Sequence, residues 1–257
     1  MSLDRLLERA AASPARLLLA GGDNAQLRQG TSRLAASGIR SAQLVGDGGL
    51  DPESHPRHES VASLLRSRAP ERVRDAIHAL DLAADPLRFA LGLAALGEAE
   101  AVVAGTGTPT TELIDAARWT LGGPEGDGGL CFAGWLQLGD GRLIAFADCG
   151  AGARLDAAGQ RRLGESVAGL HARVAGEAPN VAVLPGFRGE ENVLIFPDGA
   201  AGSLALRIAK QLAGARFLGP LLLGVGGVVA GVAANAEEDE LVGTAAATVL
   251  AAGRAGT

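Results

Sequence analysis

Short apolar runs and amphipathic stretches alternate along the first half of the chain. The runs at 16–20, 42–45 and 101–104 end at turn-forming residues and predict buried strands. Amphipathic patterns predict helices over 3–12 and 23–37. A strand, a helix and a second strand in this order predict a right-handed parallel crossover, which is typical of α/β proteins.

The middle of the chain contains loops, helices and further strands. Residues 46–60 are polar and predict a loop, after which helical patterns resume at Ala62 in two pieces interrupted near Asp85. The remaining predicted elements are a helix over 110–121, strands over 181–184 and 192–196, and helices over 156–175, 200–213 and 238–252.

A β-hairpin is predicted at 130–147. Two strand-like stretches flank Gly139-Asp140-Gly141, which is strong turn chemistry. If all three turn residues lie in the loop, Cys131 faces Cys149 on the neighbouring strand.

Residues 217–236 form the longest uncharged stretch, at twenty residues. This is the length of a membrane span, but five glycines and Pro220 argue against a helix. A buried strand followed by a glycine-rich turn explains the same residues, so no membrane segment is expected.

Charge and cysteine content argue against several classes of protein. The net charge is -6, Lys210 is the only lysine, and no basic cluster indicates nucleic-acid binding. The first 20 residues carry charges among their leucines, unlike a signal peptide. Two cysteines provide neither a disulfide framework nor metal-ligand spacing, so we expect a cytoplasmic protein without a metal.

Four blocks of sequence, in order along the chain, resemble the phosphate acetyl/butyryltransferases. They are Gly97-Glu98-Ala99-Glu100-Ala101-Val102-Val103-Ala104-Gly105, residues 143–149, Asn192-Val193-Leu194-Ile195-Phe196-Pro197-Asp198, and Glu240-Leu241-Val242 followed by Ala245-Ala246. Weaker similarity covers residues 6–47, so the resemblance spans nearly the whole chain.

The resemblance implies a two-domain α/β fold of the isocitrate/isopropylmalate dehydrogenase type with mostly parallel sheets. Residues 1–129 and 225–257 would form domain I, and residues 130–224 an inserted domain II that starts with the hairpin. The glycine-rich stretch at 122–129 suits the crossing between them. The family reaction exchanges an acyl group between coenzyme A and phosphate, and family members are typically homodimers.

Several positions that carry the chemistry of the family differ here. On the resemblance, a Ser-Arg pair falls on Ala233 and Ala234, and a catalytic Asp falls on Glu240. The family phosphate loop is replaced by residues 185–189, and at least about 30 residues of strand and helix are missing after it. Because alanine cannot pair with phosphate or an oxyanion, weakened or lost activity is expected.

A candidate anion site lies where a predicted strand passes into a helix. Its residues are Gly105-Thr106-Gly107-Thr108-Pro109-Thr110, and Thr108-Pro109-Thr110 falls on a His-Thr-Thr run of the family. Free amides at a helix start favour anions. The alternative is an ordinary turn in which Thr108 caps the helix and Pro109 occupies its first position.

Charged and strand-end residues provide the other candidates. Arg188 and Arg118 are potential cations for phosphate or coenzyme A, Arg118 standing one turn beyond Asp115, where the family has an arginine. The alternative is that Arg188 is an ordinary exposed arginine whose charge is neutralised by Glu190 or Glu191. Glu240 and Arg188 are the candidates for catalytic roles; the alternative for Glu240 is that acids at a helix start suit its dipole. The remaining ligand-binding candidates are Asp148, Cys149 and Asn235.

Three functions remain open. The first is a divergent phosphate acyltransferase that binds coenzyme A as substrate or ligand and has no tightly bound cofactor. The second is an inactive binding or regulatory protein of the same fold. An oxidoreductase is disfavoured, because no dinucleotide-binding loop or metal-binding carboxylate cluster is present in the sequence.

Overall fold

The computed structural model of the chain describes residues 1–21, 25–39, 42–46, 49–123, 129–148 and 155–253. The helices are α1 (Leu3–Ala11), α2 (Ala25–Ala36), α3 (His58–Arg68), α4 (Ala76–Ala83), α5 (Pro86–Ala95), α6 (Thr110–Leu121), α7 (Ala157–Ala175), α8 (Gly199–Ala213) and α9 (Glu238–Ala252). The strands are β1 (Leu17–Ala20), β2 (Ala42–Val45), β3 (Ala101–Ala104), β4 (Cys131–Gln137), β5 (Leu143–Asp148), β6 (Val181–Val183), β7 (Val193–Ile195), β8 (Arg216–Leu223) and β9 (Val228–Ala230).

The described strands form one continuous sheet in the order β2-β1-β3-β9-β8-β4-β5-β7-β6. The strands β2, β1, β3 and β9 are parallel to one another, and so are β5, β7 and β6. Between these groups, β8 and β4 run antiparallel to their neighbours. The α/β prediction with mostly parallel strands is therefore confirmed, including the parallel pairing of β1 with β2.

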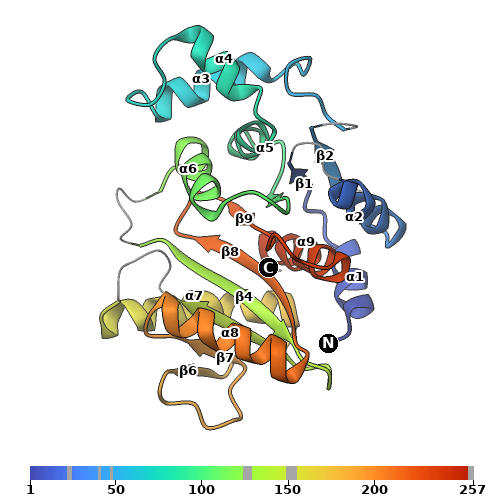
Figure 1. The fold of residues 1–257 in the computed structure, drawn as a ribbon, viewed down its shortest axis with the longest axis vertical. Coiled ribbons are helices and arrows are strands. Elements are labelled where there is room, and N and C mark those ends of the chain that lie inside the picture. The colour runs from blue at the N-terminus through green and yellow to red at the C-terminus, as the bar shows by residue number, and fades with distance from the viewer. Residues whose placement is uncertain (22–24, 40–41, 47–48, 124–128, 149–154, 254–257) are drawn as a thin grey trace.

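Helices cover both faces of the sheet (Figure 1). Alternation along β1 shows the division, because Leu17 and Leu19 belong to one hydrophobic cluster and Leu18 and Ala20 to another. The first cluster packs beneath α1, α2, α7 and α9. On the opposite face, α3 to α6 cover the amino-terminal part of the sheet and α8 covers β5 and its neighbours.

The carboxyl-terminal elements lie against the amino-terminal half. Strand β9 pairs in parallel with β3, and α9 contacts α1, α2 and β3 as well as β8 and α7. The side chains of α9 are buried from Glu240 to Val249. This helix therefore belongs to the central core of the molecule.

The hairpin has the register that its turn residues predict. Phe132 pairs with Asp148 and Gln137 with Leu143, while the amide of Leu138 donates to the carbonyl of Arg142 over 2.9 Å. The predicted register is confirmed for these strands. Cys149, the expected neighbour of Cys131, lies outside the described residues.

Two predictions about the helices are wrong in detail. The loop predicted over 46–60 ends early, because α3 begins at His58. The region that follows forms three helices rather than two, because Asp75 and Asp85 each start a new helix. Their carboxylates accept backbone N–H groups of His78 and Arg88 over 2.8 and 2.9 Å. These bonds satisfy amides at the helix starts that have no partner within the helix.

Residues 217–236 contain most of β8, a glycine-rich turn and β9. The strand and turn expected from the sequence are present, and β9 is an addition to them. No described helix is long and apolar enough to cross a membrane.

Candidate functional site

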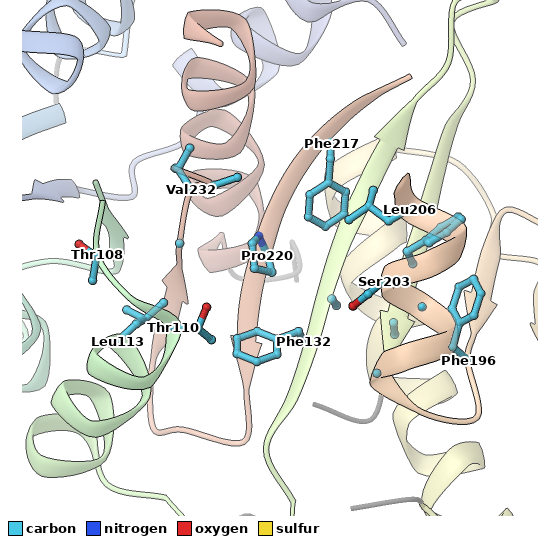
Figure 2. Close-up of a pocket in the computed structure, with 17 residues that line it drawn as sticks. Thr108, Thr110, Leu113, Phe132, Phe196, Ser203, Leu206, Phe217, Pro220 and Val232 are labelled. Atoms are coloured by element: carbon cyan, nitrogen blue, oxygen red, sulfur yellow. The ribbon is translucent and has the colours of Figure 1, made fainter. Parts of the chain in front are cut away.

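A cleft of about 490 Å³ lies between α6 and α8, on the sheet face that both helices cover. Figure 2 shows Thr108, Thr110 and Leu113 on one side and Phe196, Ser203 and Leu206 on the other. The residues that line it are Thr108, Thr110, Leu113, Phe132, Ala133, Phe146, Ala147, Phe196, Gly199, Gly202, Ser203, Leu206, Phe217, Pro220, Gly231, Val232 and Ala233.

The cleft is predominantly apolar. Four of the chain's six phenylalanines line it, namely Phe132, Phe146, Phe196 and Phe217. The rings of Phe146 and Phe196 have their centroids 4.9 Å apart. Among the described residues that line the cleft, none carries a charged side chain. The polar side chains are the hydroxyls of Thr108, Thr110 and Ser203.

Phe217 is held in the cleft from two directions. Its backbone N–H donates to the Glu240 carboxylate over 3.1 Å. On the paired strand β4, a Cβ added at Gly134 would lie 2.4 Å from the Phe217 ring. Only glycine at position 134 leaves room for the ring in this arrangement, so the local sequence of β4 fixes part of the cleft wall.

Helix α8 forms the opposite wall with its first two turns. Asp198 caps the helix by accepting the backbone N–H of Ala201 over 2.9 Å. The small residues Gly199 and Gly202 line the cleft beside Ser203 and Leu206, which leaves space between the helix and the sheet. The start of α8 therefore shapes the depth of the cleft.

The predicted anion loop contributes only part of its length to the cleft. Thr108 and Thr110 line it, whereas Gly105 packs so closely on α2 that an added Cβ would lie 2.5 Å from the Leu27 side chain. The hydroxyl of Thr106 donates to the side-chain oxygen of Gln26 over 3.0 Å. Gly107 has a positive φ of 100°, where glycine is favoured.

The expected capping role of Thr108 is wrong. The N-cap of α6 is Pro109, no side chain caps the helix, and the helix begins at Thr110. The backbone N–H of Thr108 instead donates to the Gly105 carbonyl over 3.2 Å, so this residue closes a turn before the helix. The Thr108 hydroxyl therefore makes no capping hydrogen bond to α6, and the residue lines the cleft.

Glu240 is buried and has protein partners at both oxygens. Lys210 donates to Oε1 over 2.5 Å, and the Phe217 amide donates to the same atom. Oε2 accepts the backbone N–H of Glu237 over 3.3 Å, as part of a reciprocal capping box at the start of α9. Glu240 is not among the residues that line the cleft. This geometry supports a structural role, and the predicted catalytic role has no support from it.

The structure does not bring the two predicted arginines into the cleft. Arg188 is exposed in a loop whose amides at 188, 189 and 190 all donate to Glu191 Oε2. These bonds hold the pKa of Glu191 below its usual range. Arg118 lies near the end of α6, with its side chain half-buried. Neither is among the described residues that line the cleft.

The other predicted ligand-binding residues are placed less fully. Asn235 is exposed in the turn before α9 and does not line the cleft. Asp148 ends β5, beside Ala147 of the cleft wall, but its side chain is not described. Cys149 lies outside the described residues. Within the described part of the chain, no group of His, Cys, Asp or Glu side chains could hold a metal ion.

Sequence reasoning missed the aromatic lining of the cleft. The signal was present in the hairpin, because its register places Phe132 and Phe146 on the same face of adjacent strands. Phe196 and Phe217 join them from elements that are distant in sequence. Their meeting depends on strand order, which local patterns do not reveal.

Comparison with known proteins decides the family. The family model described as phosphate acetyl/butaryl transferase matches residues 1–186 and 177–249. The chain belongs to this family. The two matched stretches overlap at 177–186, beside the loop after which a strand and a helix of the family are expected to be missing.

Known relatives agree with this assignment. The phosphate acetyltransferase of Paracoccus denitrificans is 26% identical over an alignment 287 positions long, gaps included, which covers 87% of this chain and 90% of that protein. A solved EutD phosphotransacetylase from Staphylococcus aureus has a TM-score of 0.80 and 15% identity, covering 97% of this chain and 98% of that chain. A phosphotransacetylase from Streptococcus pyogenes has a TM-score of 0.79 and 14% identity, with coverage of 98% and 99%.

These structural neighbours confirm the predicted two-domain phosphotransacetylase fold. The boundaries proposed at residues 130 and 224 stay a prediction, because one sheet continues across them. Two cleft residues coincide with positions singled out by the family resemblance. Both Thr108 and Ala233 line the cleft, and on the resemblance described above they fall on a histidine and a serine of the family.

Proposed function

We propose that the cleft is the acyl-group site of a divergent phosphate acyltransferase. The observation that carries this proposal is the meeting of Thr108, Thr110 and Ala233 in one cavity. Thr108 and Thr110 belong to one of the two family motifs recognised in the sequence, and Ala233 belongs to the other, more than 100 residues further along the chain. The substrates would be an acyl-CoA and phosphate, or in reverse an acyl phosphate and coenzyme A.

We further propose that turnover is slow or absent. Phosphoryl and acyl phosphate groups need cationic or multiple hydrogen-bonding partners, and removal of one transition-state donor typically costs about 100- to 1000-fold. Ala233 and Ala234 cannot supply such partners. The described cleft lining offers three hydroxyls and no cation in their place.

The direct test is formation of acetyl-CoA from acetyl phosphate and coenzyme A by the purified protein. We expect little or no turnover, together with thermal stabilisation by coenzyme A or an acyl-CoA, since a ligand that prefers the folded state raises its stability. NAD and ATP are the comparison ligands. Absence of stabilisation by any coenzyme A species, with no turnover, would contradict the proposed function.

An inactive protein that binds a coenzyme A or phosphate ligand is the second candidate. The lack of a described charged side chain in the cleft favours it. Stabilisation by coenzyme A species without turnover of any acyl phosphate would select this candidate over a slow enzyme. We place either activity in the cytoplasm, on the basis of the low cysteine content.

We also propose that the protein is a homodimer and that α8 forms its interface. Leu204, Ile208 and Leu212 are spaced four residues apart along α8, and their exposed fractions are 53%, 49% and 83%. Ile208 stands midway between the two leucines. Two antiparallel copies of α8 would therefore bring Ile208 against its counterpart and Leu204 against Leu212 of the partner subunit, as a two-fold interface requires.

A further inference from the structure

The lining of the cleft is more apolar than transfer of a small acyl group requires. Four phenylalanine rings and the side chains of Leu113, Leu206 and Val232 surround it. A phosphate or carboxylate placed among these groups would lose its hydration without gaining a cation, which is costly. An uncharged apolar group would instead gain from leaving water.

The cleft is also larger than an acetyl group needs. Its volume of about 490 Å³ equals roughly sixteen water molecules at about 30 Å³ each. An acetyl group has few atoms and would leave most of that space to water. The size lies within the range of pockets that enclose whole small molecules.

The polar groups are few and placed on opposite walls. Thr108 and Thr110 lie at the α6 side, and Ser203 lies at the α8 side (Figure 2). A hydroxyl can donate one hydrogen bond without bringing a charge. This suits the carbonyl oxygen of an ester, thioester or amide, whose neighbouring chain would lie against the rings.

We infer that the cleft selects a bulky apolar acyl group, either a linear chain of about six or more carbons or an aromatic acyl group, over acetyl. This inference rests on the proposed function for the presence of a thioester, and deepens it by naming the acyl class. The aromatic residues at 132, 146, 196 and 217 provide the apolar contact, and Leu206 limits the depth from α8.

The experiment uses uncharged thioesters of N-acetylcysteamine with acetyl, butanoyl, hexanoyl, octanoyl and benzoyl groups. Their binding to the full-length protein is measured by isothermal titration calorimetry. We expect affinity to rise by about fourfold for each added methylene until the cleft is filled. Equal affinity along the series, or tightest binding of the acetyl thioester, would overturn the inference.

Substitutions test whether the preference for longer acyl groups arises in the cleft. Leu206→Trp fills the cleft and should weaken hexanoyl and octanoyl binding about tenfold or more while the acetyl thioester changes little. Ile77→Trp adds the same ring on α4, where the side chain is 73% exposed and does not line the cleft, and should leave the series unchanged. If Leu206→Trp does not fold, Ser203→Phe fills the cleft from an exposed position of the same helix. Loss of chain-length preference in Ile77→Trp but not in the cleft variants would overturn the assignment.

Parallel titrations with coenzyme A and acetyl-CoA test the proposed coenzyme A function separately from the proposed acyl preference. Rising affinity in the thioester series without any binding of coenzyme A species supports an apolar acyl site and contradicts the proposed coenzyme A function. Binding of coenzyme A with no dependence on acyl length supports the proposed function and contradicts the acyl preference.

Discussion

The ammonium nitrogen of Lys210 lies 2.5 Å from Oε1 of Glu240, and this contact joins α8 to the start of α9. Lys210 is the only lysine of the chain. The same carboxylate oxygen accepts the backbone N–H of Phe217, a residue of the cleft wall. Glu240 thus connects the helix on one side of the cleft, the strand that forms its floor and the buried helix behind it.

Replacing Glu240 with Ala should therefore lower the stability of the fold. The variant leaves Lys210 and the Phe217 amide without their acceptor, and hydrogen bonds to charged groups contribute about 1.5–3 kcal/mol. We expect the free energy of unfolding, measured by urea titration, to fall by that amount. Glu238→Ala is the matched control, because its partner Arg33 and its own side chain are about one-third exposed, and it should cost less than about 1 kcal/mol.

The outcome also tests the catalytic role first assigned to Glu240. A Glu240→Ala protein that is as stable as the unmodified chain but loses ligand binding or turnover would show that the carboxylate acts on the substrate. Loss of stability with binding retained would support the structural role.

Local sequence was sufficient for most of the fold. The runs at Ala42–Val45 and Ala101–Ala104 were placed within a residue, because short apolar runs bounded by turn residues have few alternatives. The hairpin register followed from Gly139-Asp140-Gly141 for the same reason. The family resemblance, rather than the local pattern, implied the two-domain fold.

The site was less predictable because it depends on contacts between distant residues. Thr108 was expected to cap α6, yet Pro109 occupies the N-cap and Thr108 lines the cleft. The acids at the start of α9 are compatible with either a catalytic base or a helix cap. Only the folded structure shows that Glu240 pairs with Lys210. Strand order brings the Phe217 ring against Gly134, a contact that no local pattern contains.

Restoring the residues that the family resemblance implies should increase activity. The double substitution Ala233→Ser and Ala234→Arg returns a hydroxyl and a guanidinium beside the cleft. We expect acetyl-CoA formation from acetyl phosphate and coenzyme A to rise about tenfold or more, since one donor is typically worth at least that factor. Ala213→Arg, at an exposed position near the end of α8, is the control for added charge.

Robust turnover by the unmodified protein would contradict the slow-enzyme proposal. If Arg188→Ala or Arg118→Ala then abolished that turnover, the arginine concerned would be the replacement for the missing family residue. Neither lines the cleft in this structure, so such a result would require a movement of the loop or helix that carries it.

The proposed dimer can be tested at the centre of the α8 surface. Ile208→Glu places a charge where two copies would meet, and burial of an unpaired carboxylate is strongly unfavourable. We expect sedimentation velocity to show dimer for the unmodified chain and monomer for the variant. Ile77→Glu, on α4 at a position 73% exposed, is the control and should stay dimeric. A monomeric unmodified protein at micromolar concentration would contradict the proposal.

His171 should make stability depend on pH in the mildly acidic range. Its side chain is fully buried on α7, and Nε2 lies 3.1 Å from Oε1 of Glu177. Burial lowers the pKa of His171 below the ordinary value of 6.5, although the contact with Glu177 opposes this. As the pH falls through 6.5, the unfolded chain therefore takes up a proton that the folded chain does not, and the free energy of unfolding decreases.

Replacing His171 with Leu removes this titration and should flatten the pH dependence of stability just below pH 6.5, the ordinary pKa of histidine. The slope of the unfolding free energy against pH, measured by urea titration, reports the difference in bound protons between the two states. Glu177→Gln serves as the comparison, because it removes the group that raises the pKa and should keep or steepen the dependence. The same slope in His171→Leu as in the unmodified chain would show that other groups cause the acid sensitivity, since a leucine at 171 binds no proton in either state.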